Sequence, residues 1–238
     1  MTEHLFRADA YLRACTARVA AVTERGLVLD RTVFYPRAGG QPGDTGTLRW
    51  KGGEAALGEA LKGEGDAVIH PLAEGTAAPP ADAEVEVALD WPRRHRHMRM
   101  HTTLHLMCSL VPGIFATGNQ IGAEKSRLDF DLAEPPPKEW WTERLNALVA
   151  ADHPVSDGWI EEAELDANPG LVRTLSVQPP RGAGRIRLVL IGVSEAPVDR
   201  QPCGGTHVRS TDEIGGVEVL KLESKGRQNR RVSIALRD

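Results

Sequence analysis

Three features are scarce in this chain of 238 residues, and each absence excludes a class of protein. The three cysteines, Cys15, Cys108 and Cys203, are widely spaced, which excludes a disulfide scaffold and leaves metal binding or simple burial. No apolar run approaches the roughly 20 residues that span a bilayer. The first residues also lack the apolar segment of a signal peptide. We therefore expect a cytoplasmic protein without membrane contact.

An excess of basic residues is the third missing feature, since the formal net charge is -4. A general binder of phosphates usually has a basic balance, so the total charge does not indicate nucleic acid. The distribution is uneven, however. Acidic residues crowd EGDAVIHPLAEG and ADAEVEVALD, whereas arginines gather in WPRRHRHMRM and KLESKGRQNRR. From charge alone, solvated faces and a basic binding surface are equally good interpretations.

The first part of the chain has the pattern of strands. VAAV, GLVLD, RTVFYP and AEVEVALDW are short, rich in β-branched or aromatic residues, and separated by glycine and proline clusters. Several strands without intervening helices predict a small β-barrel, and Pro92 marks its end. We expect two domains, 1–91 and 92–238, and a mobile loop from Lys51 to Gly65.

The second part changes to a helical period. Met100, Leu104, Met107 and Val111 recur at spacings of three and four, which predicts a long helix ending before Pro112. SRLDFDL predicts a strand, and KEWWTERLNALVAAD and IEEAELDA predict helices. GRIRLVLIG, GVEVLKLES and RRVSIALRD predict further strands, with a turn at KGRQN. The fold class is therefore α+β, with an antiparallel sheet packed against helices in the second domain.

Two motifs carry residues that bind metals. His101 and His105 lie at i and i+4 of the predicted helix, so their imidazoles share one face. Thr102 stands where the HExxH signature has glutamate, which argues against a metallopeptidase. Cys203 and His207, in CGGTH, add a thiolate and a third imidazole around two glycines that let the backbone curl. Together the four side chains make a plausible tetrahedral zinc site.

Cys108 is a competing ligand, because it lies at i+7 from His101 on the same helical face. Seven residues correspond to roughly 10 Å of helical rise, too far for one ion to contact both side chains at about 2 Å each. We interpret Cys108 as a buried structural thiol.

Four segments together resemble a known family. RHMRMHTTLHLM, GNQIGAEKSRLDFD and QPCGGTHVRSTDEIGGVEVLKLESKGRQNRR are similar, in order and spacing, to motifs of the alanyl-tRNA synthetase editing domain and its freestanding AlaX relatives. FYPRAGGQPGDTG resembles the glycine-rich loop of the synthetase editing region and of the longer, medium-length AlaX forms. The chain departs from many relatives at Ala38 and Asn119, where they have glycine.

The resemblance implies an α/β editing domain after the small β-barrel, and it implies an activity. The expected reaction is zinc-dependent, ATP-independent hydrolysis of mischarged alanine tRNA, an aminoacyl-tRNA hydrolase activity that serves translation fidelity. In the family the corresponding pairs bind Zn²⁺, so the resemblance implies that its ligands here are His101, His105, Cys203 and His207. Gln120 aligns with a glutamine that lines the amino-acid pocket of the family, and a neutral amide suits that role. As a simpler alternative, Gln120 is a turn residue before a strand.

Further residues have less specific roles. We expect Gln120, with Thr102 or Thr206, to supply polarity that favours the seryl over the alanyl ester. The glycine-rich loop lacks the GK[ST] ending of a P-loop, so no nucleotide cofactor is expected; its candidates are Gly39, Gly40, Gln41, Gly43, Asp44 and Gly46. Its glycines permit close approach to the terminal adenosine or simply turn the chain. Candidate phosphate contacts are Arg93, Arg94, Arg96, Arg99, Lys125, Arg127, Lys225, Arg230 and Arg231.

Two readings of function remain open. In the first, a monomeric enzyme deacylates Ser-tRNA, and Gly-tRNA to a lesser degree. Four protein ligands complete a tetrahedral shell, so His207 is weakly held or the ion becomes five-coordinate. Alternatively, the ion is only an anchor, and the substrate's 2′-hydroxyl and an ordered water carry the chemistry. In the second, the chain is a zinc-stabilised RNA-binding module without catalysis. A full synthetase is excluded, because no adenylate-forming domain is present.

Overall fold

The structure, a computed structural model, describes residues 1–175, 178–179, 181–182 and 184–237. It contains two compact units, Met1–His97 and Met98–Asp238. Each unit has its own sheets. The predicted domain division after residue 91 remains a prediction, since compactness alone does not show that either part folds independently. Among the described residues, no helix is long and apolar enough to cross a membrane.

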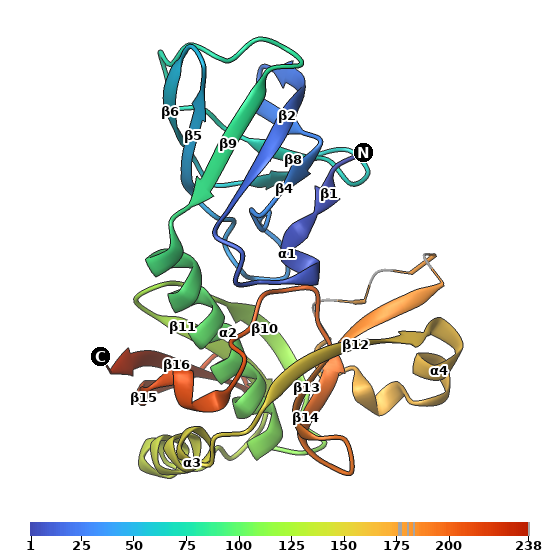
Figure 1. The fold of residues 1–238 in the computed structure, drawn as a ribbon. Coiled ribbons are helices and arrows are strands. Elements are labelled where there is room, and N and C mark those ends of the chain that lie inside the picture. Colours follow the sequence, from blue (N-terminus) through green and yellow to red (C-terminus); the bar gives the residue numbers. More distant parts are fainter. Residues whose placement is uncertain (176–177, 180, 183, 238) are drawn as a thin grey trace. The chain divides into compact units, whose positions relative to one another are not determined.

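The first unit is built on a curled antiparallel sheet of seven strands (Figure 1). The order is β6 (Gly53–Leu57), β5 (Gly46–Trp50), β9 (Glu84–Leu89), β2 (Ala14–Thr23), β3 (Gly26–Leu29), β8 (Val68–His70) and β7 (Leu61–Lys62). A small parallel pair, β1 (Glu3–His4) with β4 (Arg31–Thr32), and the short helix α1 (Leu5–Ala8) complete the unit.

Alternating side chains explain the core of this unit. In β9, Val85, Val87 and Leu89 are buried whereas Glu84 and Glu86 are exposed, as period-2 alternation predicts. An isolated bridge from Leu57 to Leu72 joins the end of β6 to the chain beyond β8. The predicted mobile loop at Lys51–Gly65 is wrong, because β6 and β7 lie within it. Closure into a small barrel remains a prediction.

The second unit contains two antiparallel sheets (Figure 1). The four-stranded sheet has the order β10 (Ala116–Gln120), β11 (Ser126–Asp131), β16 (Asn229–Arg237) and β15 (Gly216–Ser224). The three-stranded sheet has the order β12 (Val155–Glu161), β13 (Arg185–Val193) and β14 (Ala196–Pro202). Helices α3 (Lys138–Ala150) and α4 (Glu162–Ala167) and the 3₁₀ turns η1 (Pro169–Leu171) and η2 (Thr211–Ile214) connect them.

Helix α2 (Trp91–Leu110) holds the residues on which the functional site depends. The sequence predicted an apolar stripe on one face of this helix. The buried surface is wider than that stripe, because Met98 and all residues from Met100 to Cys108 are buried. A helix that is buried on all sides belongs to the interior of a domain. Arg173 caps its end by donating to the carbonyl oxygens of Cys108 and Val111 at 2.7 and 3.0 Å. Buried polar side chains on α2 therefore need partners.

Candidate metal centre

Four predicted side chains meet in the second unit. His101 and His105 come from α2, and Cys203 and His207 from the loop after β14. Their ligand atoms all lie within 4.8 Å of one another. The Cys203 Sγ is 3.4 Å from His101 Nε2 and 3.3 Å from His207 Nε2. Zinc bonds of about 2.0–2.3 Å at tetrahedral angles place ligand atoms roughly 3.3–3.8 Å apart. Both sulfur–nitrogen distances match such an ion, and the widest pair of ligand atoms, up to 4.8 Å apart, would close by about 1 Å on binding it.

Charge and burial also favour a cation at this cluster. Burial raises the pKa of the Cys203 thiol, but the adjacent imidazoles of His101 and His207 outweigh it and hold this pKa well below its usual value. Burial lowers the pKa of His105, but hydrogen bonds to Asp199 and Cys203 outweigh it and raise this pKa to about 10. Burial and the neighbouring His101 lower the pKa of His207. A divalent cation can replace the proton that such a thiolate and imidazole set attracts.

Two buried groups fix the orientation of the ligand imidazoles. His105 Nδ1 donates to Asp199 Oδ2 at 2.9 Å, so Nε2 faces the cluster. His207 Nδ1 lies 3.1 Å from Thr102 Oγ1, which donates to Met98 O at 3.0 Å and therefore accepts from the imidazole. Such partners set the tautomer of metal-binding histidines. Thr102 therefore positions a ligand, rather than offering its hydroxyl to a substrate as expected.

Three residues that matter here were missed in the sequence. Asp199 and Gln201 are buried, and the Gln201 amide donates to Asp199 Oδ2 at 2.8 Å. Arg187 holds the loop itself, since its NH1 donates to the carbonyl oxygens of Cys203 and Gly205 at 2.8 and 3.1 Å. The signal for the first two was present: they alternate at period 2 before Cys203, so all three side chains point to one face of β14 and its continuation.

Gly204, directly after Cys203, has a backbone conformation that other residues also adopt. Its φ lies outside the left-handed region, so the backbone conformation at this position does not require glycine, and the role of the two glycines in curling the loop remains a prediction. Apart from its own atoms and its two chain neighbours, no atom lies within 4 Å of the position that a Cβ would take. The residue therefore keeps space open beside the cluster.

Cys108 is buried, and burial raises the pKa of its thiol to about 12. It is not one of the four clustered residues. These observations agree with its interpretation as a structural thiol.

The other predicted substrate residues are placed differently from one another. Thr206 is buried directly before His207. Gln120 is exposed at the end of β10 rather than in a turn, and its Oε1 accepts from Arg127 Nε at 3.1 Å. The structure thus brings Thr206, but not Gln120, into the ligand loop. A role for either in substrate recognition remains a prediction.

The prediction that Arg94 contacts a phosphate is wrong. Its side chain is fully buried in the first unit, where its Nε donates to both carboxylate oxygens of Asp44 at 2.8 and 2.9 Å. It also donates to the carbonyl oxygens of Ala10 and Val33. A guanidinium so enclosed cannot reach a phosphate, and removing it would leave the Asp44 charge buried and unpaired. Arg93 donates to Gly43 O at 2.6 Å.

Most of the remaining basic candidates have protein partners. Arg127 and Arg231 both donate to Asp129, which lies between them in the four-stranded sheet. Burial raises the pKa of Asp129, but these guanidiniums outweigh it and lower this pKa overall. Arg230 donates to carbonyl oxygens of the β15–β16 turn, and Lys225 lies 3.5 Å from Glu223. Arg96 and Arg99 are half-buried, and Lys125 is exposed. Phosphate binding by these residues remains a prediction.

The glycine-rich loop is a structural element of the first unit. Ala38 and Gln41 exchange backbone hydrogen bonds around Gly39 and Gly40, whose φ angles of 58° and 85° give a type I′ turn. A Cβ on Gly43 would lie 2.0 Å from Ala60 O, and one on Gly46 would lie 2.1 Å from Ala88 O. Asp44 holds Arg94, and Gln41 is buried. These contacts show how the loop turns the chain, and close approach to adenosine remains a prediction.

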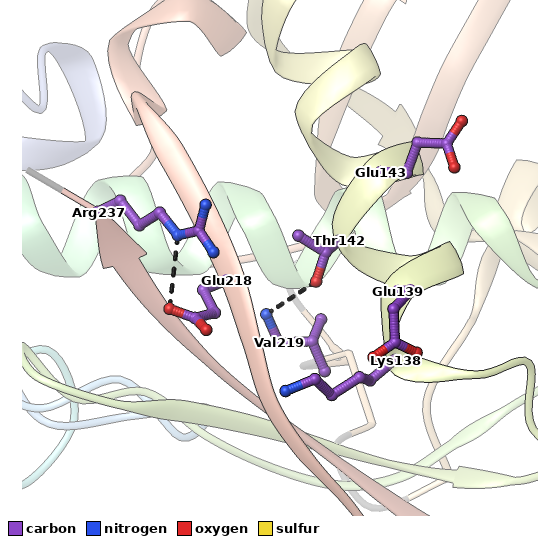
Figure 2. A pocket seen from close by; sticks show the side chains of 7 residues that line it. All are labelled: Lys138, Glu139, Thr142, Glu143, Glu218, Val219 and Arg237. Atoms are coloured by element: carbon purple, nitrogen blue, oxygen red, sulfur yellow. Dashed lines mark hydrogen bonds and ion pairs between the residues drawn. The ribbon is translucent and has the colours of Figure 1, made fainter.

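A shallow depression of about 290 Å³ lies elsewhere in the second unit, between α3 and the edge strand β15. Figure 2 shows its mixed charges, with Arg237 close to Glu218 and Thr142 bonded to the backbone of Val219. None of the predicted site residues lines it: the lining residues are Lys138, Glu139, Thr142, Glu143, Glu218, Val219 and Arg237. The depression therefore shares no residue with the metal cluster.

Comparisons with known proteins give consistent similarities. The family model described as the threonyl and alanyl tRNA synthetase second additional domain matches residues 186–233, and that of class II (A) tRNA synthetases matches residues 8–93. The alanyl-tRNA editing protein AlaX-M of Methanosarcina acetivorans is 38% identical over 251 residues, with full coverage of both chains. AlaX-M of Saccharolobus solfataricus is 30% identical, with 98% of each chain covered. The alanine–tRNA ligase of Pyrobaculum neutrophilum is 39% identical over 93% of this chain and 25% of the ligase.

Proposed function

The chain belongs to the family of AlaX-M alanyl-tRNA editing proteins, and from this membership we propose that it is a trans-editing hydrolase of mischarged alanine tRNA. The reaction is hydrolysis of the ester between a wrong amino acid and the 3′-terminal ribose. The observation that carries the proposal is the cluster of His101, His105, Cys203 and His207, with ligand atoms within 4.8 Å of one another. In this proposal the enzyme is a cytoplasmic monomer and needs no ATP. The curled sheet within residues 1–91 forms its small β-barrel domain.

The four clustered side chains hold one zinc ion in this proposal. When bound there, zinc supplies Lewis-acid chemistry that polarises an ester carbonyl or activates water. The chain's own residues provide the orientation. Asp199 fixes the tautomer of His105, Thr102 fixes that of His207, and Arg187 holds the carbonyl groups of the loop that carries Cys203. Open space beside Gly204 gives the ester a route to the cluster.

A second candidate function rests on the number of ligands. Four protein donors complete a tetrahedral shell, which is the pattern of structural zinc sites. In that case the chain is a zinc-stabilised RNA-binding module, or an enzyme whose zinc anchors the fold while the substrate's 2′-hydroxyl and a water carry the chemistry. Hydrolysis by the purified protein separates the module from the enzyme.

The preferred substrate in this proposal is the seryl ester. A site that hydrogen-bonds a hydroxyl can reject a molecule without one by factors up to roughly 10⁴. The Thr102 hydroxyl is engaged by Met98 and His207, so Thr206 and Gln120 are the remaining candidates for this recognition. Ser-tRNA should be hydrolysed fastest, Gly-tRNA more slowly, and Ala-tRNA least. Single-turnover rates on one alanine tRNA body test this order; equal rates for serine and alanine contradict hydroxyl recognition.

The metal proposal is tested with one ligand variant and a matched cysteine. We expect about one zinc per chain, and Cys203→Ala should lose both the metal and the hydrolysis of Ser-tRNA. Cys15→Ala is the control, because Cys15 is a half-buried thiol of the first unit outside the cluster. A metal-free Cys203→Ala protein with full activity would exclude a catalytic role for the ion. Retained metal in that variant would exclude Cys203 as an essential ligand.

A further inference from the structure

Trp159 is an exposed aromatic side chain on the sheet that carries the metal loop. The chain has five tryptophans, all of them described, and Trp159 is the most exposed of them, at 48%. It lies on β12, where Ile160 next to it is buried and points to the opposite face. The packing of the unit thus leaves about half of Trp159 in contact with solvent. A smaller polar side chain at this position would expose less apolar surface to water.

The register of the three-stranded sheet connects Trp159 to the metal loop. Trp159 is the cross-strand partner of Arg187, and the backbone N–H of Cys203 donates to Arg187 O at 3.2 Å. Cross-strand partners point to the same face of a sheet. Trp159, Arg187 and Cys203 therefore form a row across three strands. Two strand spacings separate the first residue from the last, which is about 10 Å between their Cα atoms.

Two arginines accompany the indole. The Arg185 guanidinium lies over the Trp159 ring, with Cζ 4.8 Å from the ring centroid. Arg187 Nε pairs with Asp157 at 3.2 Å while its NH1 holds the loop carbonyls, so its charge is already committed. Among the described residues, Arg185 makes no ion pair with a carboxylate. Its cross-strand partner Glu161 lies beyond ion-pair distance, so the guanidinium can still contact an anion from outside.

We propose that Trp159 and Arg185 form a nucleobase-stacking platform that takes the purine base of the 3′-terminal nucleoside whose ester reaches the metal cluster. This inference rests on the proposed function, because it assigns a place to the base of that same substrate. The Arg185 guanidinium covers one face of the exposed indole, so the base stacks on the opposite face or on the guanidinium plane itself, and the same guanidinium can contact the adjoining phosphate. One ribose separates the base from the ester, a reach comparable to the distance from Trp159 to Cys203.

Because Trp159 contacts only the base of the substrate in this proposal, two ligands that differ only in having or lacking this base test it. The probes are the 3′-seryl amide of 3′-amino-3′-deoxyadenosine, which cannot be hydrolysed as an ester, and the same amide on a methyl riboside without a base. Binding of each to the zinc-loaded full chain is measured by calorimetry. Loss of base–aromatic stacking in Trp159→Ala should weaken the adenosine probe by roughly 5- to 150-fold and leave the baseless probe unchanged.

Two further variants complete the design. Trp159→Phe keeps an aromatic face and should retain part of the preference for the adenosine probe. Phe115→Ala removes an aromatic side chain of similar exposure, 40%, outside the three-stranded sheet, and should have no effect. Zinc content and thermal unfolding verify that each variant is folded.

The outcomes distinguish this inference from the proposed function. If the wild-type chain binds both probes equally, or if Trp159→Ala weakens both or neither, the platform is refuted. If the wild-type chain hydrolyses no seryl ester but shows the binding pattern above, the proposed function fails and the platform stands. If hydrolysis is present while Trp159→Ala leaves the adenosine probe unaffected, the function stands and the platform fails.

Discussion

At the residue scale, the carboxylate of Asp199 decides which nitrogen of His105 faces the cluster. Replacing it with asparagine removes the charge and offers an amide that can present either end to the imidazole. Loss of such a partner typically lowers metal affinity by about 10- to 100-fold, and we expect this range for Asp199→Asn. Competition with a chromophoric chelator measures it. Asp131→Asn, an exposed carboxylate on β11, is the control; equal zinc affinity in both variants would contradict the orienting role.

His70 determines part of the acid sensitivity of the first unit. It is fully buried, with Nδ1 3.3 Å from Leu27 O and Nε2 2.9 Å from Thr32 Oγ1, and burial lowers its pKa to about 4. The neutral ring is therefore favoured in the folded state. Below the unfolded value near 6.5 the unfolded chain binds the proton more tightly. This contribution is fully present above about pH 6.5 and is lost as the pH falls toward 4.

The corresponding test compares pH dependence rather than absolute stability. The stability lost through His70 between pH 7 and pH 4 is at most about 3 kcal/mol, and His70→Gln should lose correspondingly less over that interval. Urea unfolding of both proteins at pH 7, 5.5 and 4.5 measures the difference. Parallel stability curves for the two proteins would show that His70 does not titrate as its burial indicates.

The same scale shows what could be predicted about the site. The two ligand pairs were found because each is local in sequence, its two members lying four positions apart. Asp199 and Gln201 were detectable by alternation, yet a carboxylate on a strand has many possible roles until its partner is known. Arg94 shows the opposite error, since nothing near it in sequence reveals Asp44, which lies 50 positions away and neutralises it.

At the element scale, helix α3 contributes side-chain hydrogen bonds to the backbone of β15, the edge strand of the four-stranded sheet. Asn146 donates to Val217 O at 2.8 Å and accepts from Val217 N–H at 3.0 Å. Asn146→Ala would leave both groups of a buried residue without these bonds. We expect a loss of about 2–3 kcal/mol in unfolding free energy, measured by urea denaturation. Glu143→Ala, on the exposed face of α3, is the control, and a similar small loss in both would contradict this capping role.

Elements differed in how well they could be predicted. Strands β11, β13, β15 and β16 and helices α2, α3 and α4 have apolar periods long enough to identify, and the structure confirms them. Strands β10, β12 and β14 were missed, because each has few apolar residues and draws its stability from pairing with a more apolar neighbour. The single antiparallel sheet predicted for the second half is consequently two sheets.

At the scale of the whole molecule, the two compact units place different sensitivities in different parts of the chain. The four clustered ligands belong to Met98–Asp238, whereas His70 belongs to Met1–His97. We expect chelation of zinc to speed amide hydrogen exchange in β12 to β14 and in the second half of α2, while β2, β3 and β9 stay protected. Exchange measured by mass spectrometry with and without chelator resolves this. Equal loss of protection in both units would show that they unfold together.

The separation of the two ligand pairs along the chain has a consequence for biosynthesis. His101 and Cys203 are 102 positions apart, and the intervening residues include β10 to β14. While a ribosome makes the chain, the first pair emerges long before the second. The nascent protein therefore carries only half of a binding site until β14 has been synthesised and paired with β13. Tight metal uptake should follow translation of the loop at 203–207, so the ion reports completion of this unit rather than guiding its early steps.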